Sequence, residues 1–275
     1  MRNWALATAM AVLAGCGQSE RPADEPIRPA IPAALTFDGG DAVGAAKIAH
    51  GERLATLLDC TGCHGPNLQG KDLGSPKDGA MYAPNVTLLM AQYSDAEFHR
   101  LLRAGVPKDR RELWYMPVES YQFLSDADVG ALTAFLRTVA PAGKPTPPFE
   151  KNRALQKEIA GGLIGNAQVQ LAKYRKEQPP ELGEQHAWGR YVTRNSCTGC
   201  HNGALQGWPD FSPNLDIAGA YSKPELIHLL TTGEGKVKKD LGPMTAVVKS
   251  NLSRMTPRER EAVADYVLAR ANRPQ

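Results

Sequence analysis

The pentapeptide Cys-Thr-Gly-Cys-His occurs twice in this 275-residue chain, at Cys60–His64 and at Cys197–His201. Four of the five cysteines of the chain lie in these two copies. Two cysteines separated by two residues and followed directly by a histidine place three reactive groups on one side of a single turn. The motif therefore restricts the kind of group that the chain can bind at each of these two positions.

Cys-x-x-Cys-His is the attachment sequence for c-type haem, in which the two thiols add to the porphyrin vinyl groups and the histidine becomes one axial ligand of the iron. A redox disulfide would need a βαβ context, which the sequence lacks, and a structural zinc site needs four ligands in one place. The repeat therefore predicts two covalently attached haem c groups. The residues that would hold them are Cys60, Cys63 and His64 in the first copy and Cys197, Cys200 and His201 in the second.

The similarity between the two copies extends beyond the motif. Leu68-Gln69-Gly70 matches Leu205-Gln206-Gly207 at the 137-residue offset of the cysteines, and Pro84-Asn85 matches Pro213-Asn214 at 129 because the first copy has a longer loop. We therefore expect two domains of like architecture, over residues 38–140 and 183–272, joined by a proline-rich linker over residues 141–182.

Each copy is expected to form three principal helices. The first precedes the cysteines, the second begins at a Ser-x-x-Glu capping box and stops at a glycine, and the third begins at a further N-cap residue. The expected ranges are about 41–59, 94–105 and from 125 in the first copy, and 184–196, 222–233 and from 256 in the second. No segment shows convincing strand alternation, so the predicted fold class is all-α. Residues 154–175 could add one connecting helix, although three glycines within them argue against continuity.

In this order of features the chain resembles the class I cytochrome c family. The stretch Ala83–Thr87 (APNVT), the helix end Leu-Leu-Arg-Ala-Gly and the pair Met116-Pro117 are similar to multihaem cytochrome subunits of membrane-associated alcohol, aldehyde and sugar-acid dehydrogenases. The resemblance implies that a proline carbonyl accepts a hydrogen bond from each proximal histidine. Pro213 fits this role, and Pro84 fits it if the longer loop folds back.

The second axial ligand decides what each iron can do. The candidate methionines are Met81, Met90 and Met116 in the first copy and Met244 and Met255 in the second. Only Met116 and Met244 share the 128-residue offset of the second helices, and both fall between the second and third helices, where the family carries its distal ligand. We expect both in a loop there, as iron ligands. With both faces of each iron occupied, the protein would carry electrons and would not be an enzyme.

The resemblance implies a two-haem cytochrome c that relays electrons between a periplasmic or membrane dehydrogenase and a respiratory acceptor. Two alternatives remain: a two-haem peroxidase, which needs an open iron face, and a cytochrome subunit of a terminal oxidase, which usually has a transmembrane anchor. The resemblance implies redox proteins as partners. The net charge of +3 is too small to suggest nucleic acid.

Two basic clusters also match at the 128-residue offset, just before the shared methionines. They are Lys108, Arg110 and Arg111, and Lys236, Lys238 and Lys239. They are either solvated loops or a basic rim that steers an acidic redox partner.

The first residues predict export. Arg2 precedes a short apolar run, Trp4–Ala14, and residues 1–15 therefore have the pattern of a signal peptide. The run ends in Leu13-Ala14-Gly15-Cys16, which resembles a bacterial lipobox, so Cys16 is expected to become the lipidated first residue. Residues 16–37 would then form a flexible tether. We therefore expect a protein that faces the periplasm and is anchored to a membrane by lipid. Gly17, directly after the cysteine, favours the outer membrane. The alternative is a plain secretory signal in which the cysteine occurs by chance.

Replacing Cys16 by serine (Cys16→Ser) tests the anchor, because acyl chains attached to this thiol would hold the protein on a membrane. We expect the variant to appear in the soluble fraction or as unprocessed precursor, with both haems attached. Fractionation of cells followed by a haem stain measures this. A variant that is processed normally and stays in the membrane fraction would show that the lipoprotein interpretation is wrong.

Overall fold

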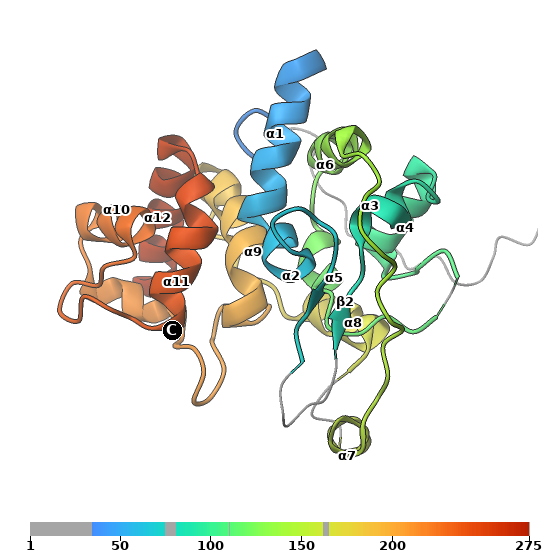
Figure 1. Ribbon diagram of the computed structural model, residues 1–275. Helices are drawn as coiled ribbons and strands as arrows, with labels where there is room; N and C mark the ends of the chain where they lie inside the picture. The colour runs from blue at the N-terminus through green and yellow to red at the C-terminus, as the bar shows by residue number, and fades with distance from the viewer. Residues whose placement is uncertain (1–34, 75–80, 110, 162–164, 275) are drawn as a thin grey trace, which may run out of the picture.

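The computed structural model describes residues 35–74, 81–109, 111–161 and 165–274, and it is mostly helical, as the sequence predicts (Figure 1). Two short strands, β1 (Lys71–Asp72) and β2 (Tyr82–Ala83), pair antiparallel and were not expected. No helix among the described residues is long and apolar enough to cross a bilayer. Cys16, the signal peptide, most of the tether and Arg110 lie outside the described residues.

The N-terminal half, residues 35–140, contains the three expected principal helices and three shorter ones. They are α1 (Gly44–Leu57), α2 (Cys60–His64), α3 (Val86–Met90), α4 (Asp95–Ala104), α5 (Val118–Tyr121) and α6 (Asp126–Thr138). The capping box predicted at Ser94 is present, and Gly105 ends α4 in the left-handed conformation at φ 62°. The local signals for these helix ends are therefore confirmed.

The C-terminal half, residues 184–274, follows the same order. Its elements are η1 (Glu184–His186), α9 (Ala187–His201), η2 (Leu215–Ala220), α10 (Lys223–Thr232), α11 (Pro243–Ser250), η3 (Leu252–Arg254) and α12 (Pro257–Ala271). The segment between the halves holds α7 (Arg153–Ala160) and α8 (Ala167–Lys176). The connecting segment is therefore not one continuous helix over residues 154–175, because Asn166 caps the start of a second helix, α8.

The first and last helices of each half cross at a glycine. A Cβ atom on Gly51 of α1 would lie 2.0 Å from the carbonyl oxygen of Ala131 in α6. A Cβ atom on Gly189 of α9 would lie 2.2 Å from the carbonyl oxygen of Ala262 in α12. Because a backbone carbonyl inside a helix cannot move aside, both crossings require glycine. Ala131 and Ala262 are 131 residues apart, the offset that aligns the third helices, so the two halves share this packing device.

A short segment before α1 joins the two halves through two buried carboxylates, Asp128 of α6 and Glu259 of α12, both 0% exposed. The backbone N–H of Phe37 donates to Asp128 at 3.0 Å, and the N–H of Asp38 donates to Glu259 at 2.9 Å. Phe37 is itself 0% exposed. The folded body therefore begins before residue 38, and the predicted tether boundary at residue 37 is wrong, because residues 36–38 are bound between the halves.

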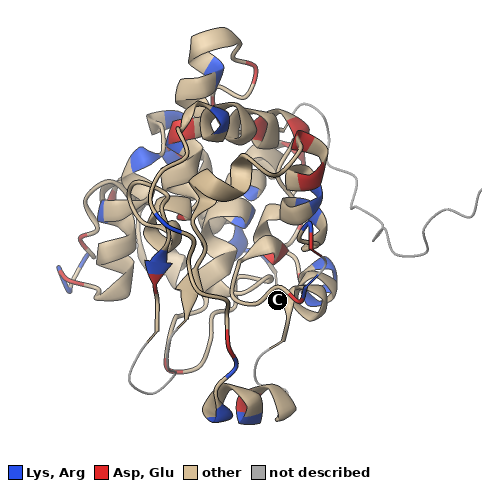
Figure 2. Ribbon diagram, turned by 45° about the vertical axis from the view of Figure 1, so that its right-hand side comes forward, with Lys and Arg blue, Asp and Glu red and all other residues tan. Residues whose placement is uncertain are grey.

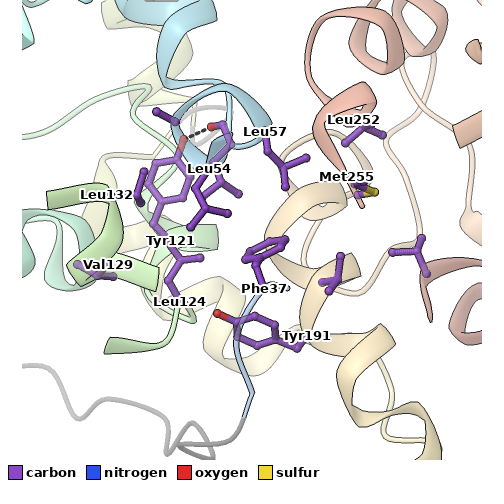
Figure 3. Close-up of a cluster of buried hydrophobic side chains, with 14 of the residues drawn as sticks. Phe37, Leu54, Leu57, Tyr121, Leu124, Val129, Leu132, Tyr191, Leu252 and Met255 are labelled. Atoms are coloured by element: carbon purple, nitrogen blue, oxygen red, sulfur yellow. Dashed lines mark hydrogen bonds between the residues drawn. The ribbon is translucent and has the colours of Figure 1, made fainter. Parts of the chain in front are cut away.

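Side chains cross between the halves in both directions. The Tyr191 hydroxyl, from α9, donates to Asp128 at 2.5 Å, and the Arg53 guanidinium, from α1, pairs with Glu259 at 2.8 Å. The rings of Phe37 and Tyr191 meet edge to face, with centroids 5.6 Å apart. Figure 3 shows Phe37 and Tyr191 between Leu54 and Tyr121 on one side and Leu252 and Met255 on the other. The hydrophobic core is therefore continuous from one half to the other.

Replacing Gly51 by alanine (Gly51→Ala) should destabilise the protein by about 1–3 kcal/mol, the usual cost of an overpacked contact. Gly130→Ala is the matched control, because its Cβ would meet only the flexible end of Lys47, at 3.3 Å. This control should gain up to about 1 kcal/mol from the higher helix propensity of alanine. Urea unfolding followed by circular dichroism measures both. Equal midpoints for the two variants would contradict the close helix crossing.

Candidate haem-binding sites

The two Cys-Thr-Gly-Cys-His copies have different helical contexts. The second forms the end of the continuous helix α9, whereas the first forms the separate turn α2, because Asp59 before it is left-handed at φ 63°. Aspartate tolerates this conformation better than most residues. The Asp59 carboxylate accepts a hydrogen bond from the Asn251 amide of the C-terminal half at 2.8 Å. The break in the predicted 41–59 helix therefore coincides with a contact between the halves.

Both motif histidines make the same hydrogen bond. His64 Nδ1 lies 2.8 Å from the carbonyl oxygen of Pro84, and His201 Nδ1 lies 2.9 Å from the carbonyl oxygen of Pro213. Because a carbonyl can only accept, Nδ1 carries the proton and Nε2 keeps its lone pair for a metal. Burial lowers the pKa of both imidazoles, only partly offset by these hydrogen bonds. Each ring is thus neutral and oriented as an iron ligand must be.

The different loop lengths explain how both prolines reach their histidine. In the N-terminal half, β1 and β2 pair Lys71 with Ala83 and return the chain to the motif just before Pro84. In the C-terminal half, a bridge between Trp208 and Ser212 makes the same return within fewer residues. Spacings of 20 and 12 residues between histidine and proline therefore give the same contact.

A cavity of about 560 Å³ lies beside the first motif and is lined by Cys60, Cys63, His64 and Met116. Its volume falls within the roughly 300–1,000 Å³ usual for cofactor sites. Burial is the main cause that raises the pKa of Cys60 to about 12 and that of Cys197 to about 11. Thiols of this kind are not the activated thiolates of redox enzymes. No cluster of three or more His, Cys, Asp or Glu side chains suited to a metal occurs in the described parts of the chain. Paired thiols, an oriented imidazole and a thioether around one cavity fit a covalently bound haem.

The candidate methionines differ in their surroundings. Met81, Met90 and Met116 all line the first cavity, but Met90 is 4% exposed and packs in the hydrophobic core. In the C-terminal half Met255 is similarly buried in the core, whereas Met244 is half-buried.

The prediction that both shared methionines lie in a loop is confirmed for Met116 and wrong for Met244. Met244 lies in the first turn of α11, because Pro243 at the first helical position starts this helix early.

The Pro-Asn turns are fixed by their asparagines. Asn85 caps α3 and also donates to the carbonyl oxygens of Ala142 and Lys144, at 2.8 and 3.2 Å. Asn214 accepts from the buried guanidinium of Arg270 at 3.0 Å. The turn at Pro84 is therefore tied to the connecting segment, and the turn at Pro213 is tied to α12.

Sequence reasoning missed the role of the connecting segment. Residues 145–149 and Lys151 line the first cavity, so the stretch predicted as a stiff linker packs against the candidate site. No local pattern signals this, since proline-rich composition predicts stiffness and not a docking position.

The second motif also lies at the contact between the halves. The hydroxyl groups of Ser120 in α5 and Thr198 in the second motif are hydrogen-bonded at 2.9 Å. Tyr174 of α8 donates to the Thr198 carbonyl oxygen at 3.2 Å. The second motif therefore packs on the helix that follows Met116.

The basic clusters are largely ion-paired, and Figure 2 shows Lys and Arg interspersed with Asp and Glu along the helices. Lys108 pairs with Glu97 at 3.5 Å, and Lys236 pairs with Glu225 at 3.1 Å, which is the same ion pair at the 128-residue offset. Lys239 pairs with Glu234 at 3.4 Å. These pairs favour solvated loops over a basic rim.

Comparison with known proteins agrees with this geometry. The cytochrome c family model matches residues 48–140. The chain is 29% identical to a subunit of nicotinate dehydrogenase from Pseudomonas putida, over 88% of this chain and 23% of that protein. It is 26% identical to the fructose dehydrogenase cytochrome subunit of Gluconobacter japonicus, over 80% of this chain and 52% of that protein. It is 27% identical to the gluconate 2-dehydrogenase cytochrome c subunit of Pantoea cypripedii, over 82% of this chain and 60% of that protein.

Residues 48–140 thus form a cytochrome c domain, and the chain is homologous to cytochrome subunits of dehydrogenases. Membership of that domain family implies covalently bound haem c. The chain spans between about a quarter and three fifths of the length of these relatives.

Glu119 of α5, three residues after Met116, is half-buried, and this burial raises the pKa of its carboxyl group from 4.5 to about 7. Below pH 4.5 the group is protonated in both the folded and unfolded states. As pH rises from 4.5 to 7 the unfolded chain loses this proton first, so folding stability falls, by at most about 3 kcal/mol at 1.36 kcal/mol per pKa unit.

Glu119→Gln should remove this loss of stability. Urea midpoints at pH 5 and pH 8 should therefore differ less in the variant than in the unmodified protein. An equal difference in both proteins would show that Glu119 does not titrate in this range.

Proposed function

We propose that each half is a class I cytochrome c domain and that the chain is a two-haem cytochrome c. It carries electrons between a dehydrogenase and a respiratory acceptor. The observation that supports this best is the repeated hydrogen bond from a motif histidine to a proline carbonyl, His64 to Pro84 and His201 to Pro213. The same neutral, oriented imidazole follows each pair of cysteines. The C-terminal half therefore has the same haem-attachment residues, in the same arrangement, as the N-terminal half.

The roles of the side chains follow from their chemistry. Haem iron supplies reversible one-electron transfer. The thiols of each motif would hold the group covalently, and Nε2 of His64 or His201 would bind the iron. The thioethers of Met116 and Met244 would each supply a second ligand to one iron, and a soft sulfur ligand favours ferrous iron and raises the potential. If two side chains bind each iron, no coordination position is left open for a substrate.

The partner class follows from the relatives. They include cytochrome subunits of fructose dehydrogenase, gluconate 2-dehydrogenase and a quinone alcohol dehydrogenase. The donor we propose is therefore a dehydrogenase that oxidises a small organic substrate. A periplasm-facing position, with lipid attached to Cys16, would keep the chain beside such a complex at the membrane. A peroxidase would need an open iron face at one of the two sites, and Met116 lines the first cavity instead.

Met116→Ala and Met244→Ala test the ligand assignment. Each should convert one haem to high spin, lower the potential of that haem and let it bind carbon monoxide when reduced, because the sixth position opens. Attachment should be unaffected, since it depends on the cysteines. Optical spectra of the oxidised, reduced and carbon monoxide-treated protein measure all three changes.

Met255→Ala is the matched control, because Met255 is a core residue of the C-terminal half. It should lose stability without a change of spin state. If Met255, Met90 or Met81 proves to be the residue whose loss opens an iron, the assignment of Met116 and Met244 is wrong.

A further inference from the structure

The connecting segment that lines the first cavity is fixed there at its beginning. The Asn85 amide, next to Pro84, donates to the carbonyl oxygens of Ala142 and Lys144. Thr146 packs so closely on Gly70 that a Cβ atom on this glycine would lie 2.5 Å from the Thr146 methyl carbon. The segment is thus part of the wall of the first cavity.

The loop that carries Met116 has a strained backbone. Tyr115 is left-handed at φ 61°, and the Met116 N–H donates to the Trp114 carbonyl oxygen at 2.8 Å, which closes a three-residue turn around Tyr115. For a bulky side chain this conformation is an outlier, and such strain persists only where the surroundings impose it. The loop therefore needs external support to keep Met116 in place.

The connecting segment contacts this loop from two sides. The ring of Phe149 meets the ring of Tyr115 edge to face, with centroids 6.1 Å apart. The Lys151 ammonium lies 4.5 Å from the centroid of the Trp114 ring and pairs with Glu112 at 2.6 Å.

The beginning of α8 adds two further bonds. The Asn166 amide donates to Glu112 at 3.3 Å, and the Ala167 N–H donates to the Leu113 carbonyl oxygen at 2.9 Å. Every residue of the loop from 112 to 115 is therefore held by a residue of the connecting segment.

We propose that Phe149 and Lys151 are positioning residues of the first haem site, and that with Asn166 they clamp the strained loop so that Met116 stays on the iron. This inference rests on the proposed function, which assigns Met116 as the ligand. The C-terminal half provides a contrast, because Met244 lies in the regular helix α11 and needs no such clamp. The clamp therefore makes ligation at the first haem dependent on the connecting segment.

Weakening the clamp should raise the fraction of protein in which Met116 has left the iron. Carbon monoxide binds only that fraction, so its apparent affinity rises in proportion. For Phe149→Ala combined with Lys151→Ala, which removes an aromatic pair and a cation–π contact, we expect about a tenfold increase at the first haem, equivalent to about 1.4 kcal/mol. The midpoint potential of that haem should fall, and the second haem should be unchanged.

The experiment uses the full-length haem-loaded protein and titrates its reduced form with carbon monoxide. Lys173→Ala is the matched control, because the Lys173 ammonium lies over the Trp208 ring at 4.6 Å, in the same connecting segment but away from the Met116 loop. It should leave the affinity at the first haem unchanged. If the double variant folds poorly, Lys151→Gln alone provides the test. It should give about a threefold increase, because it removes the cation–π contact with Trp114 and the ion pair with Glu112.

The outcomes separate the clamp from the proposed function. If Met116→Ala opens the first iron while the clamp variants bind carbon monoxide within twofold of the unmodified protein, the clamp is overturned and the ligand assignment stands. An equal increase in Lys173→Ala would also overturn the clamp. If Met116→Ala itself changes nothing, the proposed ligation is wrong.

Discussion

The hydrogen bond from a motif histidine to a proline carbonyl is the contact on which each site depends. It fixes the proton on Nδ1, leaves Nε2 available as a ligand and sets the plane of the ring. It also draws the Pro-Asn turn against the motif, and the asparagine then ties that turn to the connecting segment at the first site and to α12 at the second. The histidine of each motif is thereby oriented as the proposed iron ligand would have to be, at two places with different loop lengths.

The second constraint is the contact between the halves. Asp128 and Glu259 are equivalent N-terminal carboxylates of α6 and α12, and consecutive backbone amides at Phe37 and Asp38 bind one each. Buried carboxylates are costly unless they are fully hydrogen-bonded, so this short segment and the crossing side chains of Tyr191 and Arg53 stabilise one arrangement of the halves. If each motif holds a haem, as we propose, a fixed arrangement of the halves would keep the separation of the two groups constant.

The sequence predicts the local features of this structure well, because short patterns determine them. The capping box at Ser94 and the left-handed Gly105 each follow from one or a few residues. The contacts of Asp59 with Asn251 and of Phe149 with Tyr115 could not be predicted, since they join residues far apart in the chain. The helix at Met244 was missed because the repeat placed this methionine opposite a loop residue, whereas Pro243 starts a helix there.

The proposal of two haem sites, each with both iron faces occupied by protein side chains, is tested by the optical spectrum of the unmodified protein. Denaturation in pyridine counts the covalently attached haems, and carbon monoxide added to the reduced native protein reports open iron positions. We expect two attached haems for each chain and no stoichiometric binding of carbon monoxide at either iron. One attached haem, or stoichiometric binding of carbon monoxide at either iron in the native protein, would contradict the proposal.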